Sequence, residues 1–135
     1  MRKFLLNKLV RDAIVADMKA KGQQVVSRQL DDAEFLREAG RKVTEETGEF
    51  DAEKPDAKEL ADIIEIAETT AQAARDMAAK AGISPEELET LRLERRDKRG
   101  GFATRTYVES VTLADDDPWA DYYAADPERF KEVTE

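Results

Sequence analysis

The chain has 135 residues, of which 31 are acidic and 22 basic, giving a formal net charge of −9. This length suits one domain with its own core, and the acidic balance argues against binding to a nucleic-acid polymer. Cysteine and histidine are both absent, which excludes disulfides, thiolate metal sites, cysteine nucleophiles and histidine bases. Catalysis by this chain must therefore use carboxylates, lysine, tyrosine, hydroxyls or a bound metal ion.

Hydropathy gives no sign of a membrane segment. No stretch approaches the roughly 18 consecutive apolar residues of a membrane span, and Met1–Val10 lacks the apolar region of a signal peptide. We therefore expect a soluble, cytoplasmic protein with no membrane partner.

Two helices are expected in the first half of the chain. The first runs from about Arg11 to Lys21, with Gly22 ending it. The second begins at the N-cap residue Asp31, with Glu34 completing a capping-box-like start, and runs to about Phe50. Its apolar stripe consists of Phe35, Leu36, Ala39, Val43 and Phe50.

Two more helices follow. Asp56 caps a helix that runs to about Lys80 and ends at Gly82. Its expected buried face consists of Leu60, Ile63, Ile64, Ala67, Ala71, Ala74 and Ala78. Ser84 caps the next helix, which has Pro85 in its first turn and runs to about Lys98.

The remaining residues predict less regular structure. Thr104–Leu113 alternates in the manner of a short strand, and Ala114–Glu135 is an acidic, aromatic segment predicted to form a short helix. We expect an all-α fold, a bundle of about four main helices with short extended segments near the termini. The expected domain covers residues 1–113, and residues 114–135 form an extension that packs on the domain or on a second subunit.

Four acidic residues form two helical pairs. Glu46 and Glu49 are three residues apart, as are Glu59 and Asp62, so each pair shares one face of its helix. If a turn near Lys54 joins two antiparallel helices, Glu49 lies level with Glu59 and Glu46 with Asp62. Glu46 also falls within the apolar stripe of its helix, where an acidic side chain is costly unless it is paired or bound to a metal.

Converging carboxylates favour a hard divalent cation. Four like charges repel one another unless a cation lies among them, and an all-oxygen ligand set points to Mg²⁺, with Mn²⁺ as a substitute. Simpler interpretations remain open. Glu59 follows Asp56 by three residues, as in an ordinary capping box, and Glu45 and Glu49 suit a solvated helix face.

Three blocks of sequence resemble a known superfamily. Glu45-Glu46-x-x-Glu49, followed by Glu59-Leu-Ala-Asp62, resembles the motif of the all-α nucleoside triphosphate pyrophosphohydrolases, which include MazG-like proteins and phosphoribosyl-ATP pyrophosphohydrolase. Asn7–Asp12 and Lys98–Phe102 resemble a small MazG-like branch labelled phosphoribosyl-ATP pyrophosphohydrolase-like. One departure is Ala13–Val15, where that branch has Lys-Ile-Pro.

The resemblance implies Mg²⁺-dependent cleavage between the α- and β-phosphates of a nucleoside triphosphate, giving a monophosphate and pyrophosphate. Glu46, Glu49, Glu59 and Asp62 would be the metal ligands, and Glu45 would orient or deprotonate the attacking water. The candidates for substrate binding are Lys8, Arg11, Lys98, Arg99, Gly100, Gly101 and Phe102. Lys98 and Arg99 equally suit a helix C-terminus without any ligand.

Two alternatives remain at this point. The chain could hydrolyse phosphoribosyl-ATP in histidine biosynthesis rather than clear unwanted nucleoside triphosphates. It could also be a non-catalytic helical interaction module on the same fold. The resemblance further implies a homo-oligomer, a dimer or larger, for which the alanine face and the aromatic tail would supply contacts.

Overall fold

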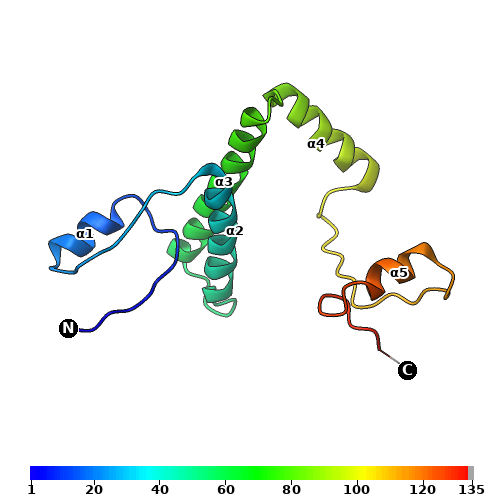
Figure 1. The fold of residues 1–135 in the computed structure, drawn as a ribbon, viewed down its shortest axis with the longest axis horizontal. Helices are drawn as coiled ribbons and strands as arrows, with labels where there is room; N and C mark the ends of the chain where they lie inside the picture. The colour runs from blue at the N-terminus through cyan, green and yellow to red at the C-terminus, as the bar shows by residue number, and fades with distance from the viewer. Residues whose placement is uncertain (134–135) are drawn as a thin grey trace. The chain divides into compact units, whose positions relative to one another are not determined.

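The computed structural model describes residues 1–133, and within them it contains five helices and no strand (Figure 1). The helices are α1 (Ile14–Ala20), α2 (Asp32–Glu49), α3 (Ala57–Lys80), α4 (Pro85–Arg99) and α5 (Pro118–Ala124). The expected all-α class is therefore confirmed. Residues 104–113, in which a short strand was expected, are irregular.

The chain divides into two compact units. The first is Met1–Lys98, and the second begins at Arg99. This boundary falls directly at the end of α4, earlier in the chain than the boundary at residue 113 expected from the extent of the sequence motifs. The first unit contains α1 to α3 and α4 as far as Lys98, and the second contains α5.

Side-chain caps fix where the two long helices begin. The Asp31 carboxylate accepts a hydrogen bond from the Glu34 amide at 2.9 Å, and Asp56 accepts one from the Lys58 amide at 2.7 Å. Each cap satisfies an amide that the first turn of a helix leaves without a backbone partner. Both predicted N-caps are confirmed.

α2 and α3 pack against each other as an antiparallel hairpin (Figure 1). An ion pair between Lys80 at the end of α3 and Asp32 at the start of α2 fixes the open end of this hairpin. The core of the seam is small: Ala39 is fully buried, Ala73 is 3% exposed and Ile66 is 9% exposed. Two alanines on facing helices allow the backbones to approach closely, because neither carries a side chain beyond Cβ.

The predicted buried face of α3 is mostly wrong, because only Ile63 and Ala78 among its seven residues are half-buried. Leu60, Ile64, Ala67, Ala71 and Ala74 are all exposed. The face that packs on α2 is centred instead on Ile66 and Ala73, about 130° away around the helix. Hydrophobic periodicity locates an apolar stripe on a helix, but it does not say whether the same chain covers that stripe.

The remaining helices follow their predicted signals more closely. The hydroxyl of Ser84 accepts from the Glu87 amide at 3.1 Å and so caps α4. α1 is shorter than expected because residues 12–13 form a turn ahead of it. Asp117 caps α5 through the Trp119 amide at 2.9 Å, which confirms a short helix in the tail.

The aromatic side chains of the second unit pack on one another. Tyr122 lies at 5.2 Å from Trp119 and at 5.8 Å from Phe130, measured between ring centroids, and Tyr123 lies at 4.9 Å from Phe130. The Trp119–Tyr122 and Tyr123–Phe130 pairs are edge-to-face, a geometry that stabilises a small cluster. No helix among residues 1–133 has the length and apolar character needed to cross a membrane.

Candidate functional site

Three carboxylates gather near the C-terminal end of α2. Glu45, Glu46 and Glu49 each offer an oxygen, and these oxygens lie within 4.8 Å of one another. Helical spacing explains the grouping, since Glu49 is one turn beyond both of its neighbours. Among residues 1–133 no other group of three such side chains lies this close together. We call Glu45, Glu46 and Glu49 the α2 acidic group.

The two predicted ligands on α3 lie outside the α2 acidic group. Glu59 and Asp62 are both half-buried in the first two turns of α3. The structure therefore gathers Glu46 and Glu49 as predicted, adds Glu45, and does not bring Glu59 or Asp62 within the same 4.8 Å. Within residues 1–133, Glu59 makes no capping-box hydrogen bond with Asp56, whose carboxylate bonds the Lys58 amide instead.

The N-terminal segment connects the acidic side chains of the two helices. Lys8 Nζ donates to Glu45 Oε1 at 3.1 Å, and Arg11 Nη2 donates to Asp62 Oδ1 at 2.7 Å. Because Lys8 and Arg11 are only three residues apart, their backbones are separated by at most roughly 10 Å. The N-terminal segment therefore contacts one acidic side chain on each helix of the hairpin.

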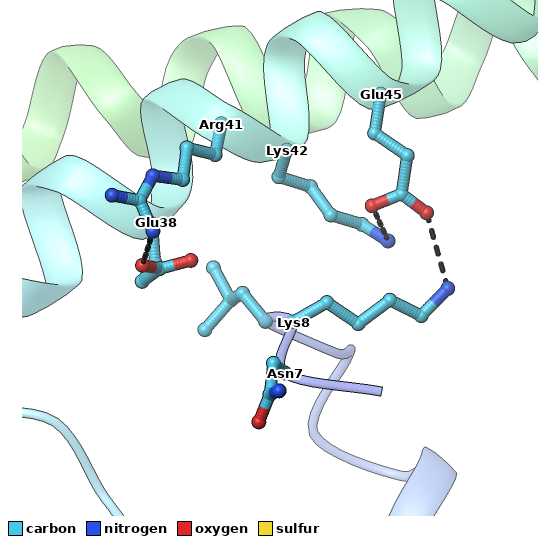
Figure 2. A pocket seen from close by; sticks show the side chains of 7 residues that line it. Asn7, Lys8, Glu38, Arg41, Lys42 and Glu45 are labelled. Atoms are coloured by element: carbon cyan, nitrogen blue, oxygen red, sulfur yellow. Dashed lines mark hydrogen bonds and ion pairs between the residues drawn. The ribbon is translucent and has the colours of Figure 1, made fainter. Parts of the chain in front are cut away.

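Lys42 provides a second cation for the α2 acidic group. Its Nζ lies 3.5 Å from Glu45 Oε2 and 3.4 Å from Glu46 Oε1. Figure 2 shows Lys8 and Lys42 approaching the Glu45 carboxylate from two directions. The hydrogen bond from Lys8, reinforced by the charge of Lys42, holds the pKa of Glu45 below its usual value. Glu45 is therefore an ionised carboxylate at neutral pH.

A shallow pocket lies between the N-terminal segment and α2 (Figure 2). Its volume is about 130 Å³, and it is lined by Asn7, Lys8, Leu9, Glu38, Arg41, Lys42 and Glu45. The backbone at Asn7 has a φ of 46°, a left-handed conformation that asparagine tolerates better than most residues. Glu38 and Arg41 form an ion pair at 2.7 Å on the pocket wall.

The third sequence block lies at the junction of the two units. Lys98 is exposed in the last turn of α4, in the first unit. Arg99, Gly100, Gly101 and Phe102 belong to the second unit, where Phe102 is 97% exposed. Gly100 follows the helix with a φ of 85°, the left-handed conformation that favours glycine just beyond a helix end. Gly100 thus ends α4.

Three pocket residues escaped the sequence interpretation, namely Glu38, Arg41 and Lys42. Lys42 precedes Glu45 by three residues and Glu46 by four, and Glu38 precedes Arg41 by three. These are the ordinary spacings of helical ion pairs, so the signal was present in the sequence. The same spacing is also very common on solvated helices. Only the approach of the N-terminal segment distinguishes these ion pairs from ordinary ones.

The carboxylates of the α2 acidic group fit a divalent cation in their chemistry. All are hard oxygen donors, which Mg²⁺ prefers, at metal–oxygen distances of roughly 2.0–2.1 Å. Exposed acidic groups of this kind are also common on helices that bind no ion. Lys8 and Lys42 meanwhile provide positive charge beside the same oxygens.

Comparison of the chain with protein-family models, curated proteins and solved structures finds no match. The resemblance to the all-α nucleoside triphosphate pyrophosphohydrolases therefore stays a prediction based on the three sequence blocks.

Proposed function

We propose that this protein is a Mg²⁺-dependent nucleotide pyrophosphohydrolase that cleaves between the α- and β-phosphates. The observation that carries the proposal is the pair of contacts Lys8–Glu45 and Arg11–Asp62. Lys8 and Arg11 come from the first block of the resemblance, and their partners come from the acidic block. Two blocks that are far apart in the sequence are thus in contact on the α2–α3 hairpin.

Each residue has a role in this proposal. Glu46 and Glu49 would hold Mg²⁺ from α2, with Asp62 and Glu59 contributing from α3, and Mn²⁺ would substitute. The ion would neutralise charge on the phosphates and lower the pKa of a water molecule. Glu45, kept ionised by Lys8 and Lys42, would orient the attacking water and accept its proton. Lys8 and Arg11 would then move from their carboxylate partners to the phosphates of the substrate.

The proposed biological role is the clearance of unwanted nucleoside triphosphates in the cytoplasm. Hydrolysis of phosphoribosyl-ATP is the alternative for the same reaction centre. Both substrates are split at the same α–β phosphoanhydride bond, so the residues described here serve either one.

Pyrophosphate release tests the activity. We expect release from at least one of a panel of canonical and modified nucleoside triphosphates and phosphoribosyl-ATP, with Mg²⁺ or Mn²⁺ and not with EDTA. Glu46→Ala and Asp62→Ala should abolish it. Glu89→Ala, which removes an acidic residue from an i,i+3 ion pair on α4, is the matched control and should retain it. Release that is insensitive to EDTA would contradict the proposal.

We also propose that the protein assembles with a second copy of itself. Leu60, Ile64, Ala67, Ala71 and Ala74 form an exposed stripe on α3, which we call the α3 stripe. Its alternating spacing of four and three residues is that of a helix–helix seam.

The α3 stripe is also the observation that favours the second candidate function, a helical interaction module without catalysis. Such a module would use the apolar stripe to bind and would not need the α2 acidic group. Mg²⁺ separates the two candidates, because an ion that binds only the folded protein raises its melting temperature. A pyrophosphohydrolase should show this rise, and the rise should disappear in Glu46→Ala.

A further inference from the structure

We propose that one face of α4 docks the acidic, aromatic segment of a second copy of this chain. The proposal rests on the assembly proposed above and is independent of hydrolysis. It adds to the α3 stripe a contact made by charged side chains. Because exposed ion pairs are individually weak, this contact strengthens the assembly and does not replace the α3 stripe. The face, which we call the α4 arginine face, consists of Arg92, Arg95, Arg96 and Arg99.

The charges of α4 are separated onto two sides of the helix. The four arginines fall within about 100° of one another around the helix axis. Four of the five acidic residues fall within an arc of equal width on the opposite side, namely Glu86, Glu87, Glu94 and Asp97. All four arginines are exposed, and no helix of residues 1–133 packs on α4. The α4 arginine face is therefore a solvent-exposed cationic surface on an acidic chain.

Most of these arginines have no anionic partner. Arg92 pairs with Glu89 at 2.6 Å, but Arg95, Arg96 and Arg99 form no ion pair within residues 1–133. No acidic residue stands three or four positions from any of these three. The four arginines instead stand three or four positions from one another, and like charges at those spacings destabilise a helix. An anionic segment that covers the face would relieve this repulsion.

Two ordinary explanations do not account for the α4 arginine face. Cations in the last turn of a helix interact favourably with its dipole, but Arg92 and Arg95 precede the last turn of α4. A solvated helix gains from pairing opposite charges at spacings of three or four residues, as α2 does with Glu38 and Arg41. The arginines of α4 gain little in this way, so the face is better explained by a partner outside the helix.

The same chain contains an acidic segment of matching charge. Residues 106–128 include seven acidic residues and no basic one. Asp115, Asp116 and Asp121 are exposed, and they too form no ion pair within residues 1–133. We call residues 115–122 the tail segment. A second copy of the chain therefore brings unpaired carboxylates that match the unpaired guanidinium groups of α4.

Aromatic side chains give the tail segment a further means of binding arginine. Trp119 and Tyr122 are exposed, and their ring centroids lie 5.2 Å apart. A guanidinium group stacks on aromatic faces and forms bidentate hydrogen bonds with carboxylates, and the tail segment offers both. A nucleic-acid backbone would also supply anions, but the net charge of −9 repels such a polymer. The tail segment is therefore the favoured occupant.

Sedimentation equilibrium of the full chain tests the proposal through two charge reversals. Arg95→Glu/Arg96→Glu reverses the charge of the α4 arginine face. Asp115→Arg/Asp116→Arg reverses that of the tail segment and leaves the Asp117 cap of α5 in place. At about 0.05 M salt, where charges are weakly screened, each variant alone should self-associate at least about tenfold more weakly than the wild type. An equimolar mixture of the two should associate like the wild type, because opposite charges then face each other.

Two controls separate docking from a change in total charge. Lys19→Glu/Arg37→Glu changes the net charge as much as Arg95→Glu/Arg96→Glu does, at exposed positions of α1 and α2, and should associate like the wild type. At about 1 M salt, where the Debye length is about 3 Å, the charge-reversal variants should match the wild type. Equal weakening in the Lys19→Glu/Arg37→Glu control would overturn the proposal, as would a mixture that associates no better than either variant alone.

The same measurement distinguishes this contact from the α3 stripe. Association that is lost in Ile64→Asp and unaffected by charge reversal would keep the α3 stripe and remove the α4 contact. Association that survives Ile64→Asp and is lost on charge reversal would do the opposite. Charge reversals that lower the melting temperature without weakening association would place the contact within one chain and overturn the proposal. A wild type that stays monomeric in low salt would also overturn it, while pyrophosphate release would still test the enzyme.

Discussion

At the scale of single residues, Glu45 is the side chain on which most contacts of the candidate site converge. It pairs with Lys8 from the N-terminal segment and with Lys42 from its own helix, and its side chain is 28% exposed. Glu46 on the same turn is 16% exposed and shares Lys42. The structure thus gives these two carboxylates distinct surroundings, although their sequence positions are adjacent.

The lowered pKa of Glu45 predicts a pH dependence of stability. Lys8 is the main cause of the shift, and an ionised carboxylate that is paired in the folded state stabilises that state. This contribution is present above the unfolded pKa, which is about 4.3 for glutamate, and it is lost as the pH falls through the lower, folded pKa. The stability difference between the wild type and Glu45→Gln should therefore be largest above about pH 5 and shrink on acidification.

Urea unfolding from pH 7 down to pH 3 checks this. Glu34 also has a lowered pKa, caused chiefly by its hydrogen bond with Arg28, so Glu34→Gln shows how a carboxylate outside the candidate site behaves. A Glu45→Gln difference that stays constant over the whole range would contradict the prediction.

The Lys8–Glu45 pair should matter little for stability and much for activity. Both side chains are partly exposed, at 42% and 28%, and exposed ion pairs contribute about 0–1 kcal/mol. A double-mutant cycle with Lys8→Gln and Glu45→Gln should therefore give a coupling of less than about 1 kcal/mol. Under the proposed function, pyrophosphate release by Lys8→Gln should fall at least about tenfold. A large coupling with normal turnover would make Lys8 a structural residue.

At the scale of the helices, the sequence predicts starts and ends better than faces. Asp31, Asp56, Ser84 and Asp117 cap their helices as their residue types predict, because a cap is a local interaction between a side chain and the next turn. The face of α3 that packs on α2 is a tertiary property. Two apolar sets lie on this helix, and the sequence alone does not say that Ile66 and Ala73 are the set buried within the chain.

The contacts of the candidate site likewise divide into those that the sequence could predict and those that it could not. The grouping of Glu45, Glu46 and Glu49 follows from helix geometry and could be predicted. The partners of Lys8 and Arg11 depend on the path of an irregular segment with no helix or strand to guide it. The resemblance implied only that these two residues bind substrate, and their pairing with Glu45 and Asp62 required the structure.

The tight α2–α3 seam predicts a strong response to added volume. Ala39 is fully buried in the seam, so Ala39→Leu must push the two helices apart and should cost about 1–3 kcal/mol. Ala79→Leu adds the same side chain at an exposed position near the end of α3 and should be nearly neutral. Chemical unfolding of both variants measures the difference, and equal effects would mean that the seam is looser than described.

At the scale of the whole molecule, the small core needs an explanation. Within the described residues only Ala39, Ile66 and Ala73 are buried apolar side chains, and no large side chain is fully buried. A chain of this length normally buries about two thirds of its unfolded surface. Conformational entropy opposes folding at every ordered residue, and in the proposed assembly folding would depend in part on the α3 stripe that a second copy covers.

The last prediction follows from that dependence. Ile64 is 59% exposed at the centre of the α3 stripe, and in the proposed assembly it is buried against a second copy. Ile64→Asp would place a charge in that apolar seam, so it should dissociate the assembly and lower the melting temperature. Val26→Asp makes the same kind of change at a position that is 97% exposed and outside the α3 stripe, and it should leave the mass unchanged. Light scattering coupled to size-exclusion chromatography gives both masses. A wild type that is monomeric at every concentration would show that the α3 stripe is not covered by a second copy, and the small core would then predict a low melting temperature for the single chain.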